Sequence, residues 1–192
     1  MRFEKGRKDR THERILEVAA RRLLRDGIAG SGLAGIMAEA GLTNGAFYAH
    51  FSSKNDMVEK SLERATDEQW EQFEKEIAAG QLMDIVRAYL SKSHRDHPDT
   101  GCPSAALLPE ISRQGPATRG VYTASVERLL KALEKQLSNV PRGPKAREVA
   151  IGTLGLVIGT LQLARAIDDP SLSDQILSAG IRVAVTLLHS NK

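Results

Sequence analysis

The sequence predicts an all-α protein in which a small N-terminal helix-turn-helix unit precedes a larger helical part. Along almost all of the 192 residues, apolar side chains recur three and four positions apart, the spacing that puts them on one face of a helix. The runs end at glycines and prolines, which stop helices. The composition, 41% hydrophobic and 27% charged, is that of an ordinary soluble globular protein.

The segment from Leu33 to Phe51 is predicted to form two short helices joined by a tight turn. Gly41 supplies the left-handed residue at which the first helix would end, and the Thr43 hydroxyl suits the cap of the second. Phe47 and Phe51, four apart, would pack on the first helix. Small residues are left outward: Gly45, Ala46 and Ala49. An ordinary helical hairpin within a soluble core would show the same spacing.

The positive charge of the chain is concentrated at the end that carries this hairpin. Residues 1–60 hold 11 Lys and Arg against 8 Asp and Glu, whereas the rest holds 16 of each. The excess is sharpest in a basic arm before the first helix: Arg2, Lys5, Arg7, Lys8 and Arg10. A basic arm beside a helix that can enter a major groove is typical of a DNA-binding module. A solvated terminus is the alternative for the arm by itself.

The other predicted helices cover most of the chain. The first runs from Thr11 to Arg25 and stops at Asp26-Gly27. Ser53 and Asp56 resemble a capping box that starts a long fourth helix ending near Gly80. Five more helices are expected, with a polar break from His94 to Pro103: Leu82–Ser93, Ser104–Arg113, Val121–Val140, Lys145–Ile167 and Ser171–Leu188. We expect two domains, residues 1–53 and residues 54–192.

The last two helices indicate self-association. The helix from Lys145 to Ile167 is apolar on most sides, and glycines at 152, 155 and 159 permit close approach of another helix. A second copy that supplies the same pair of helices would form a four-helix bundle across a two-fold axis. A fully buried central helix in a monomer is the alternative.

The sequence predicts a cytoplasmic protein with no membrane partner. The N-terminus has charges but no hydrophobic core of a secretory signal. The longest apolar run, Ile151 to Leu163, is interrupted by glycines and is too short to cross a bilayer. A single cysteine, Cys102, leaves no internal disulfide framework and fits a reducing compartment.

The hairpin and its flanks resemble the TetR family of bacterial transcriptional regulators. The resemblance covers about a quarter to a third of the chain and rests on these residues: Ile15, Ala19-Ala20, Gly27, Ile36, Ala40-Gly41-Leu42-Thr43, Gly45, Phe47-Tyr48-Ala49-His50-Phe51, Ser53-Lys54 and Leu62. It implies a DNA-binding domain followed by an all-helical domain that binds a small molecule and dimerises. The Gly101-Cys102-Pro103 segment resembles one branch of the family.

The resemblance also implies roles for individual residues in binding double-stranded DNA. Base edges would be met by Thr43, Asn44, Gly45 and Ala46, and phosphates by Tyr48, His50 and Lys54. The family usually has Ser or Thr immediately before Leu33, where this chain has Gly32, so Ser31 is expected to make that contact instead. Because few long side chains face outward, thymine methyls and DNA shape are expected to contribute to specificity.

The candidates for chemistry lie in the C-terminal part. The aromatic residues Trp70, Phe73, Tyr89 and Tyr122 are expected to line a ligand cavity together with Cys102, although aromatics at helical spacing are more often core. Cys102 follows His94 and His97, so a redox or electrophile sensor is one reading and an unreactive cysteine the other. No second ligand pair indicates a metal, and no motif indicates a catalytic site or a cofactor.

The expected function is therefore a dimeric repressor, released from a palindromic operator when a small-molecule inducer binds the C-terminal domain. Such a release is a coupling free energy, so inducer and operator must weaken each other reciprocally. The alternative class is a helical small-molecule-binding protein or enzyme whose N-terminal hairpin is structural.

Overall fold

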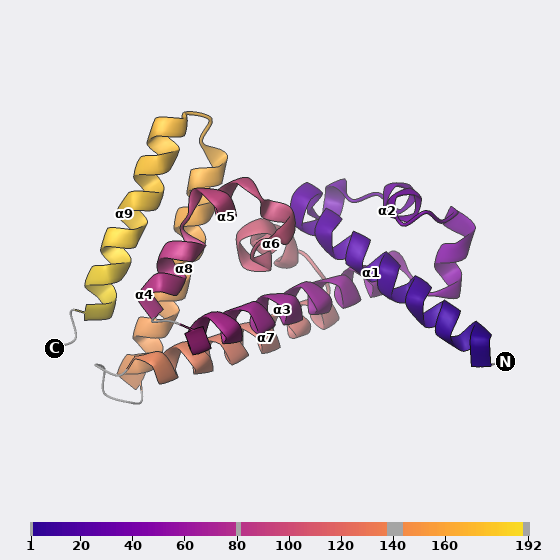
Figure 1. Cartoon of the computed structure of the whole chain (residues 1–192), viewed down its shortest axis with the longest axis horizontal. Coiled ribbons are helices and arrows are strands. Elements are labelled where there is room, and N and C mark those ends of the chain that lie inside the picture. Colours follow the sequence, from indigo (N-terminus) through magenta and orange to yellow (C-terminus); the bar gives the residue numbers. More distant parts are fainter. Residues whose placement is uncertain (1, 80–81, 138–143, 190–192) are drawn as a thin grey trace. The chain divides into compact units, whose positions relative to one another are not determined.

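The computed structural model describes residues 2–79, 82–137 and 144–189, and every regular element in these ranges is a helix (Figure 1). The predicted all-α class is confirmed. The chain forms two compact units. The N-terminal unit comprises the residues up to 68 together with 99–122, and the C-terminal unit comprises 69–98 and the residues from 123 onward. The predicted functional division between residues 53 and 54 stays a prediction.

The first helix is longer than predicted. α1 spans Arg2–Gly30, so the backbone of the basic arm is helical, and the helix is interrupted at Gly27 with φ 78° and ψ 167°. The predicted stop at Asp26-Gly27 corresponds to this kink, because only glycine adopts such a conformation readily. The residues after the kink turn into one more helical stretch that ends before Ser31.

The predicted hairpin is present, with a shorter and tighter second helix than expected. α2 spans Leu33–Glu39, and Gly41 has φ 70°, as predicted for the residue that ends it. The second helix is a 3₁₀ helix, η1, which spans Asn44–Ala49. Thr43 occupies the predicted capping position, but its side chain makes no capping hydrogen bond. The expected cap is therefore wrong, and the hydroxyl is not used in holding the helix.

The start of the fourth helix is capped by side chains. α3 spans Lys54–Ala79. The Ser53 hydroxyl accepts a hydrogen bond from the backbone N–H of Asp56 at 3.0 Å. The Asp56 carboxylate in turn accepts one from the backbone N–H of Ser52 at 2.8 Å. The capping box is thus confirmed, with the return bond made to Ser52. The predicted end of this helix at Gly80 lies outside the described residues.

One helix that the sequence assigned to the C-terminal part packs in the N-terminal unit. α6 spans Pro103–Ile111, and its side chains Leu107 and Ile111 lie in the same buried cluster as those of α1, α2, η1 and α3. Phe47 and Phe51 belong to this cluster too, with exposures of 1% and 2%. The buried face of the hairpin is therefore packed in a 19-residue hydrophobic cluster.

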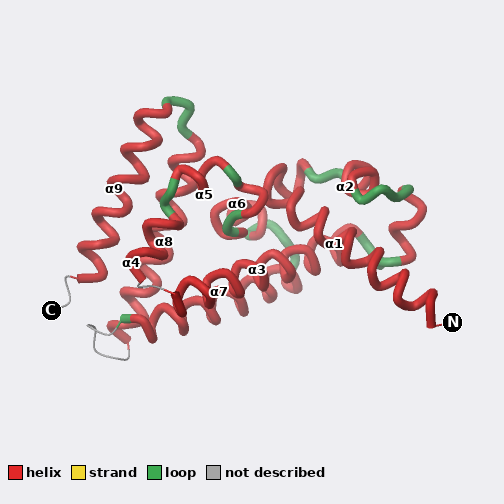
Figure 2. Tube along the Cα trace, viewed as in Figure 1, coloured by secondary structure: helices red, strands yellow, loops and turns green. Residues whose placement is uncertain are grey.

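In the described residues, the regular elements of the C-terminal unit are all helices (Figure 2). Besides the end of α3, it contains α4 (Leu82–Tyr89), α5 (Lys92–Asp96), most of α7 (Pro116–Gln136), α8 (Pro144–Ala166) and α9 (Pro170–His189); a 3₁₀ turn, η2 (Pro98–Thr100), follows α5. α4 ends earlier than predicted because the Ser91 hydroxyl accepts a hydrogen bond from the His94 N–H and caps a new helix. The end predicted for α7 at Val140 lies outside the described residues.

The α8 helix corrects the expectation that no segment is long enough to cross a bilayer. By length and composition alone, this helix of 23 residues meets that requirement. A core helix of a soluble protein meets the same two criteria. Within the chain, α8 packs along α9, and Ala150, Val157 and Leu161 are buried.

Candidate DNA-binding surface and ligand cavity

The η1 helix has one buried face and one exposed face. The Phe47 ring is buried and lies 5.4 Å, centroid to centroid, from the ring of Phe51. Tyr48, the next residue, is 74% exposed, and Asn44 and Gly45 are exposed as well. The hairpin is therefore anchored by aromatic packing while the first turn of η1 remains open to a partner.

Ala46 differs from the prediction that it faces outward. It is half-buried and packs against the hydrophobic cluster of the N-terminal unit. The reason is the helix type, because a 3₁₀ helix has three residues per turn and so rotates successive side chains further than an α-helix does. The backbone N–H of Ala46 donates to the Thr43 carbonyl at 3.0 Å, the short bond of that helix.

Ser31 also departs from its predicted role. Its side chain is 0% exposed, and its hydroxyl donates a hydrogen bond to the Gly27 carbonyl at 2.7 Å. Its backbone N–H donates to the same carbonyl at 3.1 Å. A side chain in this position offers no exposed atom to a phosphate, so the expected direct contact is not supported. Ser31 instead closes the end of α1 and positions the start of α2.

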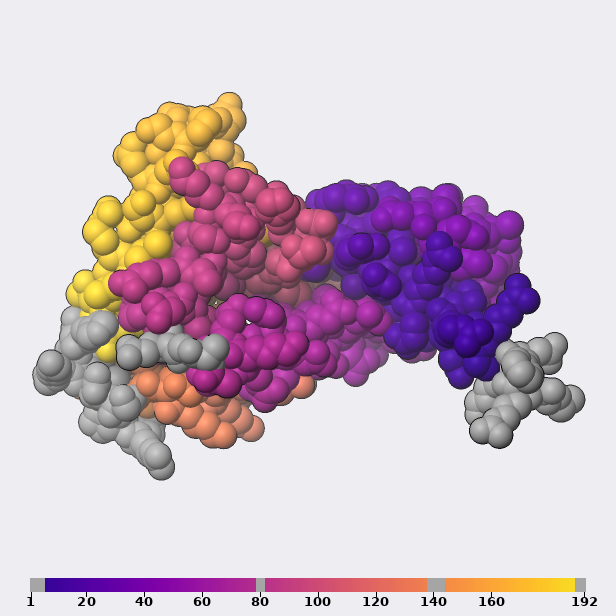
Figure 3. All heavy atoms as spheres, in the orientation of Figure 1, coloured from indigo at the N-terminus to yellow at the C-terminus, as the bar shows by residue number. Residues whose placement is uncertain are grey.

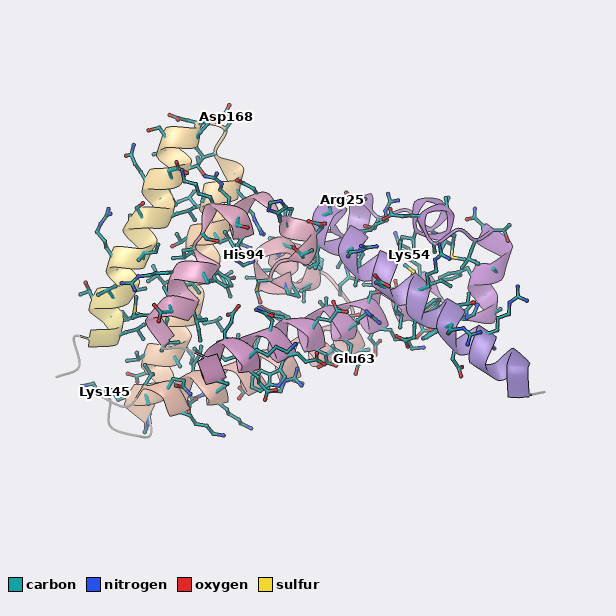
Figure 4. The ribbon with its side chains drawn as sticks, in the orientation of Figure 1. Arg25, Lys54, Glu63, His94, Lys145 and Asp168 are labelled. Carbon is teal, nitrogen blue, oxygen red and sulfur yellow. The ribbon has the colours of Figure 1, made fainter. Side chains whose placement is uncertain are left out.

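The predicted phosphate contacts Tyr48, His50 and Lys54 all lie in the N-terminal unit, around η1 and the first residue of α3; Figure 4 labels Lys54. His50 is half-buried, and burial, followed by the positive charges of His12 and Lys8, lowers its pKa. Its Nδ1 atom is buried and has no hydrogen-bond partner within the described part of the chain. In Figure 3 the N-terminal half of α1, in indigo, forms part of the same unit's surface.

A cavity that is partly open to solvent lies within the C-terminal unit. Two of the predicted ligand residues, Phe73 and Tyr89, line it. The remaining lining residues come from α3, α4, α7 and α8: Gln69, Leu82, Ile85, Val86, Leu129, Leu133, Thr153, Leu154 and Val157. None of the described lining residues carries a charge. The arrangement is that of a site for a largely apolar small molecule.

The other predicted ligand residues lie elsewhere. The Trp70 ring lies 6.0 Å, centroid to centroid, from the ring of Phe73, and the Arg128 guanidinium lies over its face at 4.7 Å. Trp70 is therefore next to a lining residue but is not itself in the lining of the cavity. Cys102 is 3% exposed, and the Tyr122 hydroxyl donates to the Ser104 hydroxyl at 2.9 Å. Both belong to the N-terminal unit because α6 packs against α1.

Sequence reasoning missed Thr153, which lines the cavity from α8. Thr153 is one of few polar residues in an apolar helix, and this pattern could have indicated it. The glycine spacing of the same helix was instead interpreted as a sign of close packing between helices.

The imidazoles of His94 and His97 each donate to a backbone carbonyl, of Tyr89 at 2.7 Å and of Ser93 at 2.8 Å. Among the described residues, no group of three or more His, Cys, Asp or Glu is placed to hold a metal ion.

Comparison with known proteins decides the family. Residues 15–60 match the model of the bacterial regulatory proteins of the tetR family. These residues therefore form the DNA-binding segment of a TetR-family transcriptional regulator. The matched segment includes α2, η1 and the capped start of α3, and its helix-turn-helix is the DNA-binding part of the regulator. No curated protein matches the sequence.

Solved structures of TetR-family regulators share the fold over nearly the whole chain. A transcriptional regulator from Cytophaga hutchinsonii is 19% identical with a TM-score of 0.76, covering 93% of this chain and 95% of its own. Reduced NemR from E. coli is 21% identical with a TM-score of 0.73, covering 91% and 94%. FadR from Bacillus subtilis, in complex with stearoyl-CoA, is 16% identical with a TM-score of 0.65, covering 92% and 97%. These likenesses show that the chain has the fold of these proteins; the special branch indicated by Gly101-Cys102-Pro103 stays a prediction.

Proposed function

We propose that this TetR-family regulator is a homodimeric cytoplasmic repressor that occupies a palindromic operator and leaves it when a small molecule fills the C-terminal cavity. The observation that carries the proposal is the division of η1 into two faces. Phe47 holds it in the hydrophobic cluster, whereas Asn44 and Tyr48 are exposed. A short helix fixed in this way presents its N-terminus and outer side chains to a major groove.

The proposed base contacts come from the start of η1: Thr43, Asn44, Gly45 and Ala46. Only Thr43 and Asn44 carry polar groups, and the Thr43 hydroxyl makes no capping bond, which supports its use on a base edge. The proposed phosphate contacts come from Tyr48, His50 and Lys54. Ala46 is half-buried and carries no polar group. The remaining specificity is supplied by close approach of the backbone to the DNA, by contact with thymine methyls and by DNA shape.

The proposed dimer forms through α8 and α9. On α8, Ile151 and Leu163 are 51% and 53% exposed, and the glycines between them lie on the same exposed face. On α9, Leu172 and Val183 are 43% and 53% exposed. A Cβ atom at Gly159 would meet nothing within 4 Å in a single chain. An apolar face with glycines at its centre is suited to close packing against a second copy.

The proposed response to ligand passes through continuous helices. α3 and α7 each have residues in both compact units, and in both helices the C-terminal part supplies lining residues of the cavity. A ligand that shifts these segments would change the spacing of the two recognition helices in the dimer. The coupling needed is typically about 1–3 kcal/mol. The neighbour that holds stearoyl-CoA supports ligand binding in this fold.

DNA binding is tested by selecting duplexes from a random library with the purified protein and measuring affinity against salt concentration. A palindromic preference and a steep fall in affinity with salt are expected. Lys54→Ala should reduce the salt slope by about one. Lys145→Ala, at an exposed lysine of the C-terminal unit labelled in Figure 4, should leave it unchanged. Failure to retain any duplex would favour the alternative, a helical small-molecule-binding protein or enzyme.

The dimer is tested by the mass of the protein in solution. Gly159→Leu should give a folded monomer, because the side chain has space within one chain but blocks approach of a second. Gly120→Leu is the matched control, since a Cβ there also meets nothing within 4 Å but lies on α7, away from the proposed interface. A Gly159→Leu protein that stays dimeric would contradict the proposed interface.

A further inference from the structure

The hydroxyl of Thr153 is a polar group of the cavity wall in the C-terminal unit whose hydrogen-bonding capacity is unused. Thr153 is 3% exposed, lines the cavity, and its Oγ1 has no hydrogen-bond partner within the described residues. A threonine within a helix often bonds to the carbonyl four residues earlier, and Thr153 does not. Buried polar atoms of folded proteins are nearly always paired, so an exception in a cavity wall indicates a partner that binds there.

Two other polar side chains line the cavity. Gln69 and Tyr89 each have an interaction within the chain. The hydroxyl is therefore placed to meet a polar atom of an otherwise apolar molecule.

Three basic side chains of the C-terminal unit have partners within the chain. Arg165 donates from Nε to the Arg95 carbonyl at 3.1 Å and from Nη2 to the His94 carbonyl at 2.6 Å. The Arg128 guanidinium lies over the Trp70 ring at 4.7 Å. The His94 ring packs edge-on against Tyr89, with centroids 4.7 Å apart, and burial lowers its pKa. The described lining itself offers no charged side chain to an anionic ligand.

We propose that the ligand of this cavity is an uncharged, mainly apolar small molecule with one hydroxyl or carbonyl group, which hydrogen-bonds to Thr153 Oγ1. The regulatory meaning of this inference rests on the proposed function. The uncharged, mainly apolar lining selects the body of the ligand, and the buried Thr153 hydroxyl selects its orientation. Fatty carboxylates of the same length are rejected, because their charge would be buried without a partner.

The test compares three eight-carbon probes below their solubility limits: 1-octanol, octanoate and 1-chlorooctane. Trp70 is the only tryptophan and lies next to Phe73 of the lining, so its fluorescence reports occupancy. Octanol is expected to bind at least about tenfold more tightly than octanoate. Equal binding of the two, or no binding of octanol, overturns the inference.

Thr153→Val keeps the shape of the side chain and removes only the hydroxyl. Octanol affinity is expected to fall about fivefold, with 1-chlorooctane unchanged, because only the alcohol uses the hydrogen bond. The thermal midpoint of the unliganded variant is expected to rise, since an unpaired buried hydroxyl has been removed. Thr160→Val, on the same helix but outside the lining, is the control. An unchanged ratio of octanol to chlorooctane affinity in Thr153→Val overturns the role of the hydroxyl.

A second readout separates this inference from the proposed function. If octanol binds with the expected ranking and also weakens the affinity for DNA, the result supports both this inference and the proposed function. The same ranking with unchanged DNA affinity supports the ligand class and overturns the proposed release mechanism, because a coupled ligand must weaken operator binding.

Discussion

The carboxylate of Glu110 accepts a hydrogen bond from the backbone N–H of Ala29 at 2.8 Å. The donor lies just after the kink of α1, and the acceptor lies on α6, 81 residues further along the chain. The same carboxylate contacts the position where a Cβ atom of Gly27 would be. The entrance to the helix-turn-helix is thus shaped by α6 as well as by its own sequence.

The kink at Gly27 should not tolerate alanine. With φ 78° and ψ 167°, the residue lies in a region that is essentially reserved for glycine, and a Cβ would meet Glu110. Gly27→Ala is expected to lower the free energy of unfolding by about 2 kcal/mol, measured by urea denaturation. Gly30→Ala is the matched control, because its Cβ would only make an ordinary contact with Asp26 at 3.6 Å. Equal losses in both variants would contradict the assignment.

Gly32 precedes α2 in an extended conformation, with φ −71° and ψ 141°, and a Cβ there would meet nothing within 4 Å. Gly32→Ser should therefore fit, cap α2 with a gain of a few tenths of a kcal/mol, and supply the phosphate contact that buried Ser31 does not. We expect tighter binding to a selected DNA duplex, measured by titration at fixed salt. Gly32→Ala has the added carbon without the hydroxyl, and a similar gain in that variant would refute the explanation.

The Asp56 carboxylate should make the protein more stable above about pH 4. A hydrogen bond from Lys60, followed by that from the Ser52 N–H, lowers its pKa below the usual value of about 3.9. Its contribution is therefore present above the unfolded-state pKa and lost as pH falls through the lower folded-state pKa. Asp56→Asn should lower the free energy of unfolding by about 1 kcal/mol at pH 7.

The loss in Asp56→Asn should shrink towards zero at pH 2.5, where the wild-type carboxyl is protonated too. Thermal unfolding at the two pH values measures this difference. Glu74→Gln, at an exposed position on the same helix, should show little loss at either pH. A loss in Asp56→Asn that is independent of pH would contradict the role of the charge.

His50 should make the protein less stable in mild acid. Burial, then the charges of His12 and Lys8, lowers its pKa below the unfolded-state value of about 6.5, so the unfolded chain binds a proton more readily. The contribution of neutral His50 to the free energy of unfolding is fully present above about pH 6.5 and falls as the pH decreases from there. His50→Gln is expected to reduce the loss of unfolding free energy between pH 7.5 and 5.5, whereas His97→Gln, at an exposed position, should not.

Several features followed from neighbouring residues alone. The positive φ at Gly41, the Ser53–Asp56 cap and the stacking of Phe47 on Phe51 each depend on interactions within four residues. Such interactions are set by helix geometry, which a sequence displays directly. The all-α class and the helix-turn-helix were predictable for the same reason.

The cavity was predictable only in part. Phe73 and Tyr89 were found because aromatic residues are frequent in ligand sites. Trp70 was placed in the same set, but it stacks under Arg128 beside the cavity. Thr153 was missed, because the unpaired state of a hydroxyl depends on every group around it and no local pattern displays that.

By itself, then, the sequence determined the helical class, the position of the hairpin and the family, since these reside in spacing and local chemistry. Only the tertiary structure decided which unit each distant segment joins. It placed α6 against α1, which carried Cys102 and Tyr122 away from the cavity, and it buried Ser31. The physical reason is that the burial of a side chain depends on the apolar surfaces that long-range packing brings together, and residues many turns apart share no period that reveals it.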